Sequence, residues 1–165
     1  MAGNSCQEFL PWAYGNCLVL TGMDIIRGTI SVADERISRV PLEVDRITLA
    51  KRRWHAAAVD GREFGFDLDK PLADGALFFR EGEKIYAIAQ KPEPVLEIPL
   101  GDGAGAARLG WMIGNLHFPI ELGEGSAFTV DDTAARNLFQ RENVPFAGVK
   151  RVFRPLTAGM SHGRH

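Results

Sequence analysis

The sequence predicts an α+β protein, with a β-rich first half and a second half that alternates strands with helices. In the first half, apolar and polar residues alternate on either side of short turns such as Asp60-Gly61. In the second half, two stretches repeat apolar residues at helical spacing, and each lies between extended segments. The halves join in the segment QKPEPVLEIPL, where Pro92 and Pro94 are typical of a short linker.

Residues 1–22 lack a clear periodicity, so we treat them as an N-terminal extension. One hypothesis is that they follow from an upstream start codon, which makes Met23 the alternative start. The next run, MDIIRGTISV, is typical of a first strand. It opens a β-rich region that we assign to residues 23–92.

Residues 23–92 are expected to form a sandwich-like β domain. Asp60-Gly61 is a strong hairpin signal, and Glu81-Gly82-Glu83 fits a second turn between two extended runs. After the first turn, alternate residues of the run EFGFDL are apolar, which gives that strand one buried face. His55 lies inside one of these strands without a second ligand nearby. A partly exposed strand residue is therefore its favoured interpretation.

Residues 93–156 are expected to form a second domain with the order strand, helix, strand, strand, helix, strand. Its elements are a strand at 95–100, a helix with Ala106, Leu109, Gly110 and Ile113 on its inner face, strands at 118–122 and 127–130, a second helix with Ala135, Leu138 and Phe139 on its buried face, and a strand at 148–154. Asp131 or Asp132 is the expected N-cap of the second helix, and Asn143 and Pro145 are expected to end it. This order is that of a ferredoxin-like unit, an antiparallel sheet with both helices on one face. Residues 157–165, TAGMSHGRH, predict a short flexible tail.

Composition excludes several classes of function. The chain has 165 residues and a formal net charge of −2, so neither nucleic acid nor an anionic membrane is an expected partner. No run approaches the roughly 18–20 apolar residues of a membrane helix. The N-terminus lacks a signal-peptide pattern, and Cys6 and Cys17 match no common metal motif, so we expect a cytoplasmic protein. Hydrolase and phosphate-binding motifs are absent, which argues against an enzyme.

The histidine in GWMIGNLHFPIEL, His117, raises the main functional question. Carboxylates are the only other metal-type ligands within ten residues on either side. If the preceding helix persists, the imidazole lies on or near its apolar face, and periodicity alone favours such a structural role. The alternative is a metal ligand that a twofold axis pairs with its copy in a second chain. His162 and His165 in the tail would add imidazoles, which suit nickel, copper and zinc, but an incidental tail fits the sequence equally well.

Three segments together resemble the C-terminal domain of the UreE family, the urease accessory nickel metallochaperones. They are RLGWMIGNLHFPIEL, FTVDDTAARNLFQRENV and FRPLTAGMSHGRH. The β-rich first half, with DGREFGFDL and QKPEPVLEI, resembles the N-terminal, peptide-binding-type domain of that family. The resemblance runs from Met23 to about the end of the chain and leaves out residues 1–22.

The resemblance implies a homodimer built through the ferredoxin-like domains, with a nickel site at the dimer axis. The histidine of the Gly-Asn-x-His pattern, here His117, would make that site, and the tail histidines His162 and His165 would complete or feed it. Ni(II) is then the cargo, and Zn(II) or Cu(II) would bind in vitro. The resemblance further implies delivery to apo-urease in a complex with the accessory GTPase and the other accessory proteins.

This chain departs from the family pattern at three places. Leu116 stands where the family often has arginine, Asp131-Asp132 stands where some members have further histidines, and the tail holds only two histidines. These differences argue against an auxiliary imidazole site and against nickel storage, but not against delivery. The alternative function is a dimeric protein-interaction or regulatory module without metal delivery.

The apolar residues around His117 lead to a prediction about assembly. Trp111, Met112, Leu116 and Phe118 form an unusually apolar edge of helix and strand. We expect a second chain to cover part of this edge.

Overall fold

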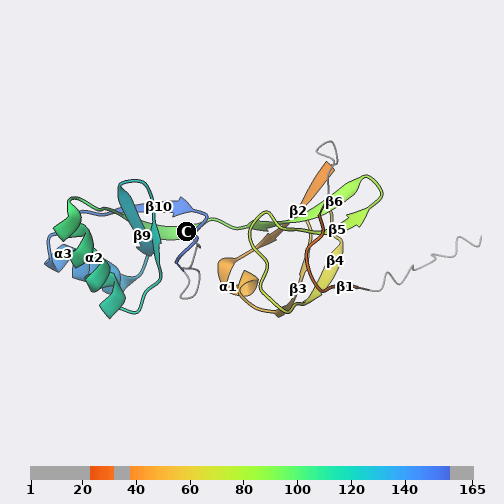
Figure 1. Ribbon diagram of the computed structural model, residues 1–165, viewed down its shortest axis with the longest axis horizontal. Coiled ribbons are helices and arrows are strands. Elements are labelled where there is room, and N and C mark those ends of the chain that lie inside the picture. Colours follow the sequence, from red (N-terminus) through yellow and green to blue (C-terminus); the bar gives the residue numbers. More distant parts are fainter. Residues whose placement is uncertain (1–22, 32–37, 157–165) are drawn as a thin grey trace, which may run out of the picture.

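Strands dominate the computed structural model, which describes residues 23–31 and 38–156 of the chain. The strands are β1 (Asp24–Ile26), β2 (Ser38–Val44), β3 (Arg53–Ala57), β4 (Glu63–Asp67), β5 (Leu77–Glu81), β6 (Lys84–Gln90), β7 (Glu93–Pro99), β8 (Ile120–Leu122), β9 (Ser126–Val130) and β10 (Ala147–Arg151). The helices are α1 (Arg46–Leu49), α2 (Gly103–Asn115) and α3 (Thr133–Arg141). Figure 1 shows two lobes, the first with β1 to β6 and α1, the second with β7 to β10, α2 and α3. The predicted α+β class is confirmed, whereas the predictions for residues 1–22 and 157–165 lie outside the described residues.

The first lobe contains two three-stranded sheets, with the orders β1-β4-β3 and β2-β6-β5. The Asp60-Gly61 turn joins β3 and β4 as an antiparallel hairpin, as predicted, and the second hairpin joins β5 and β6. The largest buried side chains of this lobe come from both sheets and form one core, which includes Leu42, Phe64, Phe66, Phe78 and Tyr86. β1 and β2 pair in parallel with β4 and β6, which the sequence patterns did not predict.

Two elements of the first lobe were missed from the sequence. β2 contains Pro41, whose missing N–H is tolerated because β2 lies at the edge of its sheet. The run RITL, which belongs to a stretch that we described as β-rich, forms the single helical turn α1. The Asp45 side chain caps this turn by accepting a hydrogen bond from the Thr48 N–H at 2.8 Å.

The second lobe contains a four-stranded antiparallel sheet with the order β10-β7-β9-β8. Leu96 and Ile98 of β7 belong to the same buried cluster as residues of α2 and α3, so both helices cover one face of the sheet (Figure 1). The helices begin where side chains cap them, because Asp102 accepts from the Gly105 N–H and Asp132 from the Ala134 N–H, each at 2.7 Å. The described elements follow the strand and helix order that periodicity predicts.

Several predicted boundaries and faces in the second lobe are wrong. β7 begins at Glu93, so Pro94 lies within a strand rather than in a linker. β10 ends at Arg151, because Phe153 turns onto the helix-free face of the sheet and is fully buried there. Gly110 is exposed, and Met112 takes its place on the inner face of α2 at 3% exposure.

Polar contacts hold the two lobes against each other. Arg46 of α1 forms a bidentate pair with Glu93 of β7, with N–O distances of 2.7 and 3.2 Å. The buried side chain of Gln90 donates a hydrogen bond to the carbonyl of Phe153 at 2.7 Å. Arg154 pairs with Asp74 at 2.6 Å. Burial alone would raise the pKa of Asp74, but the hydrogen bond from the Gln90 N–H and the charge of Arg154 outweigh it and lower that pKa.

Candidate functional site

The helix that precedes His117 stops short of it. α2 ends at Asn115, and Leu116 is its C-cap residue, with φ −79° and ψ −5°. His117 then adopts a positive φ of 54° and donates its backbone N–H to the carbonyl of Gly114 at 3.0 Å. The side chain is exposed. The sequence-based alternative in which the helix continues and the imidazole joins its apolar face is therefore wrong.

A positive φ is unusual for a histidine at the end of a helix. The residue after a helix C-cap commonly adopts this left-handed conformation, and it is then usually glycine and sometimes asparagine. The second helix of the same lobe follows that rule, because Asn143 has φ 52° after α3. For residues with a Cβ this conformation costs roughly 1–2 kcal/mol. The His117 side chain is exposed, and no hydrogen bond or ion pair joins it to a described residue, so its contacts within the described chain do not offset this cost.

The electrostatic surroundings of His117 favour a cation. It lies at the carboxyl end of α2, where the helix dipole is negative, and the last turn of α2 holds no basic residue. The nearest carboxylate along β8, Glu121, uses one oxygen to pair with Arg151 at 2.7 Å and the other to accept from the Arg154 N–H at 2.6 Å. In the described part of the chain, no three histidine, cysteine or carboxylate side chains converge into a metal site.

Strand β9 holds the segment after His117 in place. Thr129 of β9 is fully buried and donates its hydroxyl to the carbonyl of Pro119 at 2.9 Å. β8 then pairs with β9 from Ile120 onward. The imidazole therefore projects from a backbone corner that the sheet fixes on one side and α2 fixes on the other.

The segment that leads into the tail lies beside the same corner. The Leu156 N–H donates to the carbonyl of Ile120 at 2.7 Å, so the chain returns to the edge strand β8 just before residue 157. The Cα atoms of Ile120 and His117 are three residues apart and therefore at most about 11 Å apart. The six residues from Leu156 to His162 can span up to about 20 Å when extended. His162 and His165 lie outside the described residues, but the tail begins within reach of His117.

The surface next to His117 differs in part from the apolar edge that the sequence predicts. Trp111 is 68% exposed on the outer side of α2, as expected, whereas Met112 belongs to the core. Leu116 and Phe118 are half-buried. A groove of about 480 Å³ runs between α2 and α3, with Trp111 and Leu116 on one wall and Leu138 on the other. The apolar edge is therefore narrower than predicted.

The remaining described histidine lies elsewhere. His55 is an exposed residue of β3 in the first lobe, as the sequence suggests. Two features of the corner could not be read from the sequence. The left-handed backbone conformation of His117 could not be predicted from its neighbours, because the residue at this position after a helix is normally glycine or asparagine. The contact between Leu156 and Ile120 joins residues far apart in the chain. No described helix is both long enough and apolar enough to span a membrane.

Comparisons with known proteins point to one family. The family model described as the UreE urease accessory protein, C-terminal domain, matches residues 93–165. A urease accessory protein UreE of Pseudomonas fluorescens strain SBW25 is 22% identical over 119 residues, which is 70% of this chain and 72% of its own. One from Geobacillus kaustophilus is 25% identical over 138 residues, 79% of this chain and 93% of its own. One from Azorhizobium caulinodans is 29% identical over 131 residues, which is 73% of this chain and 63% of its own. Matches of this length extend beyond residues 93–165 into the first lobe.

Proposed function

Because the chain belongs to the UreE family of urease accessory proteins, we propose that it binds Ni(II) as cargo and delivers it to apo-urease during assembly of the urease active site. The protein then acts as a metallochaperone and not as an enzyme. Its relatives are described as accessory proteins, which supports this role.

The observation that carries the proposal is the placement of His117. Its exposed imidazole projects from a left-handed corner at the negative end of α2, where glycine would be the less strained residue. A strained backbone with an exposed, unpaired side chain is more typical of a functional residue than of a structural one. Imidazole nitrogen is also a preferred ligand of nickel.

One imidazole cannot hold a metal by itself, so we propose that the site is completed by a second subunit and by the tail. In a homodimer with a twofold axis near the corner, the two copies of His117 face one nickel ion. His162 and His165 supply further nitrogens, for which the tail origin beside Ile120 gives the necessary reach. The exposed Trp111 of α2 is the apolar surface that the second subunit would cover.

The wider assembly is part of the same proposal. The partners are the urease accessory GTPase and the complex of apo-urease with its accessory proteins, in the cytoplasm. We assign dimerisation and metal binding to a ferredoxin-like domain of residues 93–156, and we assign residues 23–92 to a peptide-binding-type domain. The separate apolar cores of the two lobes support this division.

Nickel titration by calorimetry tests the proposal on three proteins: the wild type, His117→Ala and His55→Ala. His55 is the matched control, because it is also an exposed histidine but lies in the other lobe. We expect the His55 variant to keep the tight site and the His117 variant to lose it, with both remaining dimers by light scattering. A His117 variant that keeps one tight nickel ion per dimer would refute the assignment. A wild type that takes up no nickel at micromolar concentration would favour a protein-interaction module instead.

A further inference from the structure

The outer face of the β1-β4-β3 sheet carries a shallow apolar hollow. The strand register aligns Ile25 of β1, Gly65 of β4 and His55 of β3 in one row across this face. Gly65 leaves the middle of the row without a side chain, and a Cβ there would lie 2.8 Å from Ile25 Cδ1 and 3.0 Å from Met23 Cε. Met23 and Ile25 are 48% and 52% exposed. The hollow has a volume of about 330 Å³, enough to receive one apolar side chain of a partner.

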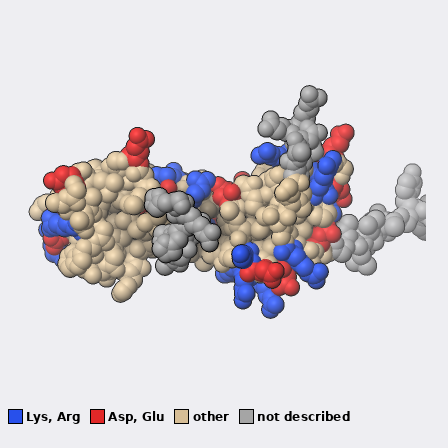
Figure 2. Space-filling model, in the orientation of Figure 1, with Lys and Arg blue, Asp and Glu red and all other residues tan. Residues whose placement is uncertain are grey.

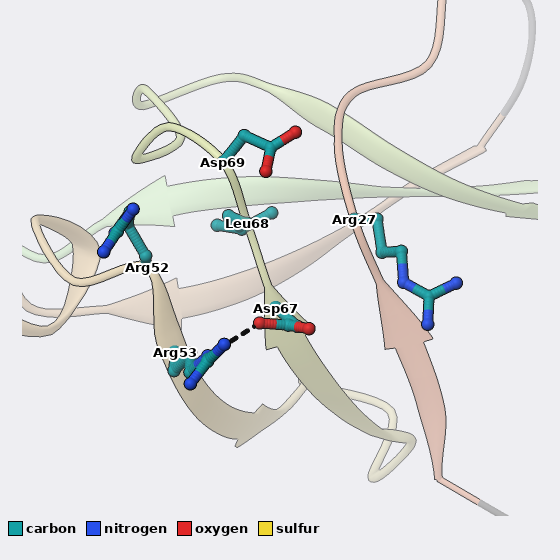
Figure 3. Close-up of a pocket in the computed structure, with 6 residues that line it drawn as sticks. All are labelled: Arg27, Arg52, Arg53, Asp67, Leu68 and Asp69. Atoms are coloured by element: carbon teal, nitrogen blue, oxygen red, sulfur yellow. Dashed lines mark hydrogen bonds and ion pairs between the residues drawn. The ribbon is translucent and has the colours of Figure 1, made fainter.

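The next row of the same face carries charge. Figure 3 shows Asp67 between Arg53 and Arg27, and Arg53 Nε lies 2.8 Å from Asp67 Oδ1. This ion pair is open to solvent, because the side chains of Arg53 and Asp67 are 85% and 50% exposed, so Arg53 can change partners at little cost. Arg27 and Arg52 form no ion pair with any residue in the described ranges.

The charged row and the apolar hollow form one continuous surface. Arg53 and Asp67 line both the hollow and the neighbouring pocket of about 520 Å³, which also contains Arg27 and Arg52. Basic side chains flank acidic ones along the lower edge of the first lobe in Figure 2. Successive rows on one face of a sheet are about 7 Å apart. A ligand that uses both rows therefore has an apolar group and negative groups within a few residues of each other.

We propose that this face docks an acidic segment of a partner protein, with one apolar side chain entering the hollow beside Met23 and Ile25. Carboxylates of that segment pair with Arg27, Arg52 and Arg53. A continuous polyanion fits less well, because Asp67 and Asp69 lie among the guanidinium groups and repel it. Residues 1–22 of the chain itself supply only one carboxylate, that of Glu8, and so do not provide the complementary charge. The inference rests on the proposed assignment of residues 23–92 to a peptide-binding-type domain, and it does not depend on the proposed nickel site in the other lobe.

Fluorescence anisotropy with a labelled peptide, Gly-Phe-Glu-Asp-Glu-Asp-Gly, tests the docking surface on the full chain. Two control peptides replace its acidic residues by lysine and asparagine, or its phenylalanine by serine. Of the three peptides, we expect only the first, which has both the phenylalanine and the acidic residues, to bind. Its affinity should fall as salt is raised. No binding of this peptide to the full chain would overturn the proposal, including the case in which residues 1–22 cover the face.

Variants then locate the binding. The double change Arg27→Glu with Arg52→Glu should weaken peptide binding by at least about tenfold, because it reverses two attractive charges. The matched control, Arg39→Glu with Lys91→Glu, alters the net charge equally at exposed residues outside the surface and should leave binding unchanged. Gly65→Ala places a methyl group where Ile25 Cδ1 and Met23 Cε now lie, so it displaces these two side chains that line the hollow without changing charge and should also weaken binding. Equal losses in both double variants, or no loss in the Gly65 variant, would overturn the proposal. Circular dichroism melting of each variant checks the fold.

Discussion

Replacing His117 by glycine should make the protein more stable and, at the same time, abolish its tight nickel site. The left-handed backbone at φ 54° costs an L-residue roughly 1–2 kcal/mol, and glycine removes that cost. We take about 1 kcal/mol, the lower end, because histidine tolerates this conformation better than most residues. Little is lost with the imidazole, since it is exposed and makes no hydrogen bond with a described residue.

Glycine also has a cost, because it gives the unfolded chain more conformational freedom, worth about 0.4–1 kcal/mol. The two effects leave a net stabilisation of up to about 0.6 kcal/mol. For a chain of this size, that corresponds to a rise in melting temperature of at most about 2 °C. Urea unfolding of the metal-free protein, together with nickel calorimetry, measures both consequences of the one substitution.

Two control variants separate the backbone effect from the loss of the side chain. His117→Ala keeps the Cβ and the strain, so its stability should stay within about 0.5 kcal/mol of the wild type. Asn143→Gly makes the same backbone change after α3, where asparagine is already well suited, and should stabilise the protein less. Loss of stability in His117→Gly would show that the imidazole holds the corner together. A tight nickel site that survives in this variant would show that the metal binds elsewhere.

Further predictions concern the tail, the dimer and the junction of the lobes. A chain that ends at Gly159 lacks His162 and His165, so it should fold normally but bind nickel more weakly in calorimetry; equal affinity would make the tail a passive end. Trp111→Ser should shift light scattering from dimer toward monomer with little change in monomer stability, because the side chain is 68% exposed; an unchanged dimer would place the interface elsewhere. Asp74→Asn should destabilise the protein by about 1 kcal/mol or less near neutral pH, because Arg154 is largely exposed. The lowered pKa of Asp74 means that its contribution is present above the ordinary value of 3.8 and is lost as pH falls through the native value. In urea unfolding, the free energies of unfolding of the wild type and of Asp74→Asn should therefore converge as the pH becomes acidic. A difference between them that stays constant with pH would contradict this.

Local sequence signals predicted the second lobe well, for identifiable physical reasons. Strand and helix periodicities alternate along residues 93–151, and Asp132 is a good N-cap that satisfies the free N–H groups of α3. Asp60-Gly61 predicted a hairpin because its residues tolerate the positive φ of a tight turn, and Gly61 has φ 87°. His117 stood out as a candidate site by its residue type and isolation alone.

What the sequence by itself determined is therefore local: the class of the fold, the order of elements in the second lobe, and the candidate histidine. Only the tertiary structure decided that β1 and β2 pair in parallel with strands far along the chain, and that Leu156 returns to Ile120. The physical reason is that periodicity and capping depend on near neighbours, whereas parallel pairing depends on the whole core that the strands bury. The left-handed backbone conformation of His117 is likewise decided by the tertiary structure. No local preference of histidine demands it, and it persists because α2 and β8 fix the chain on both sides.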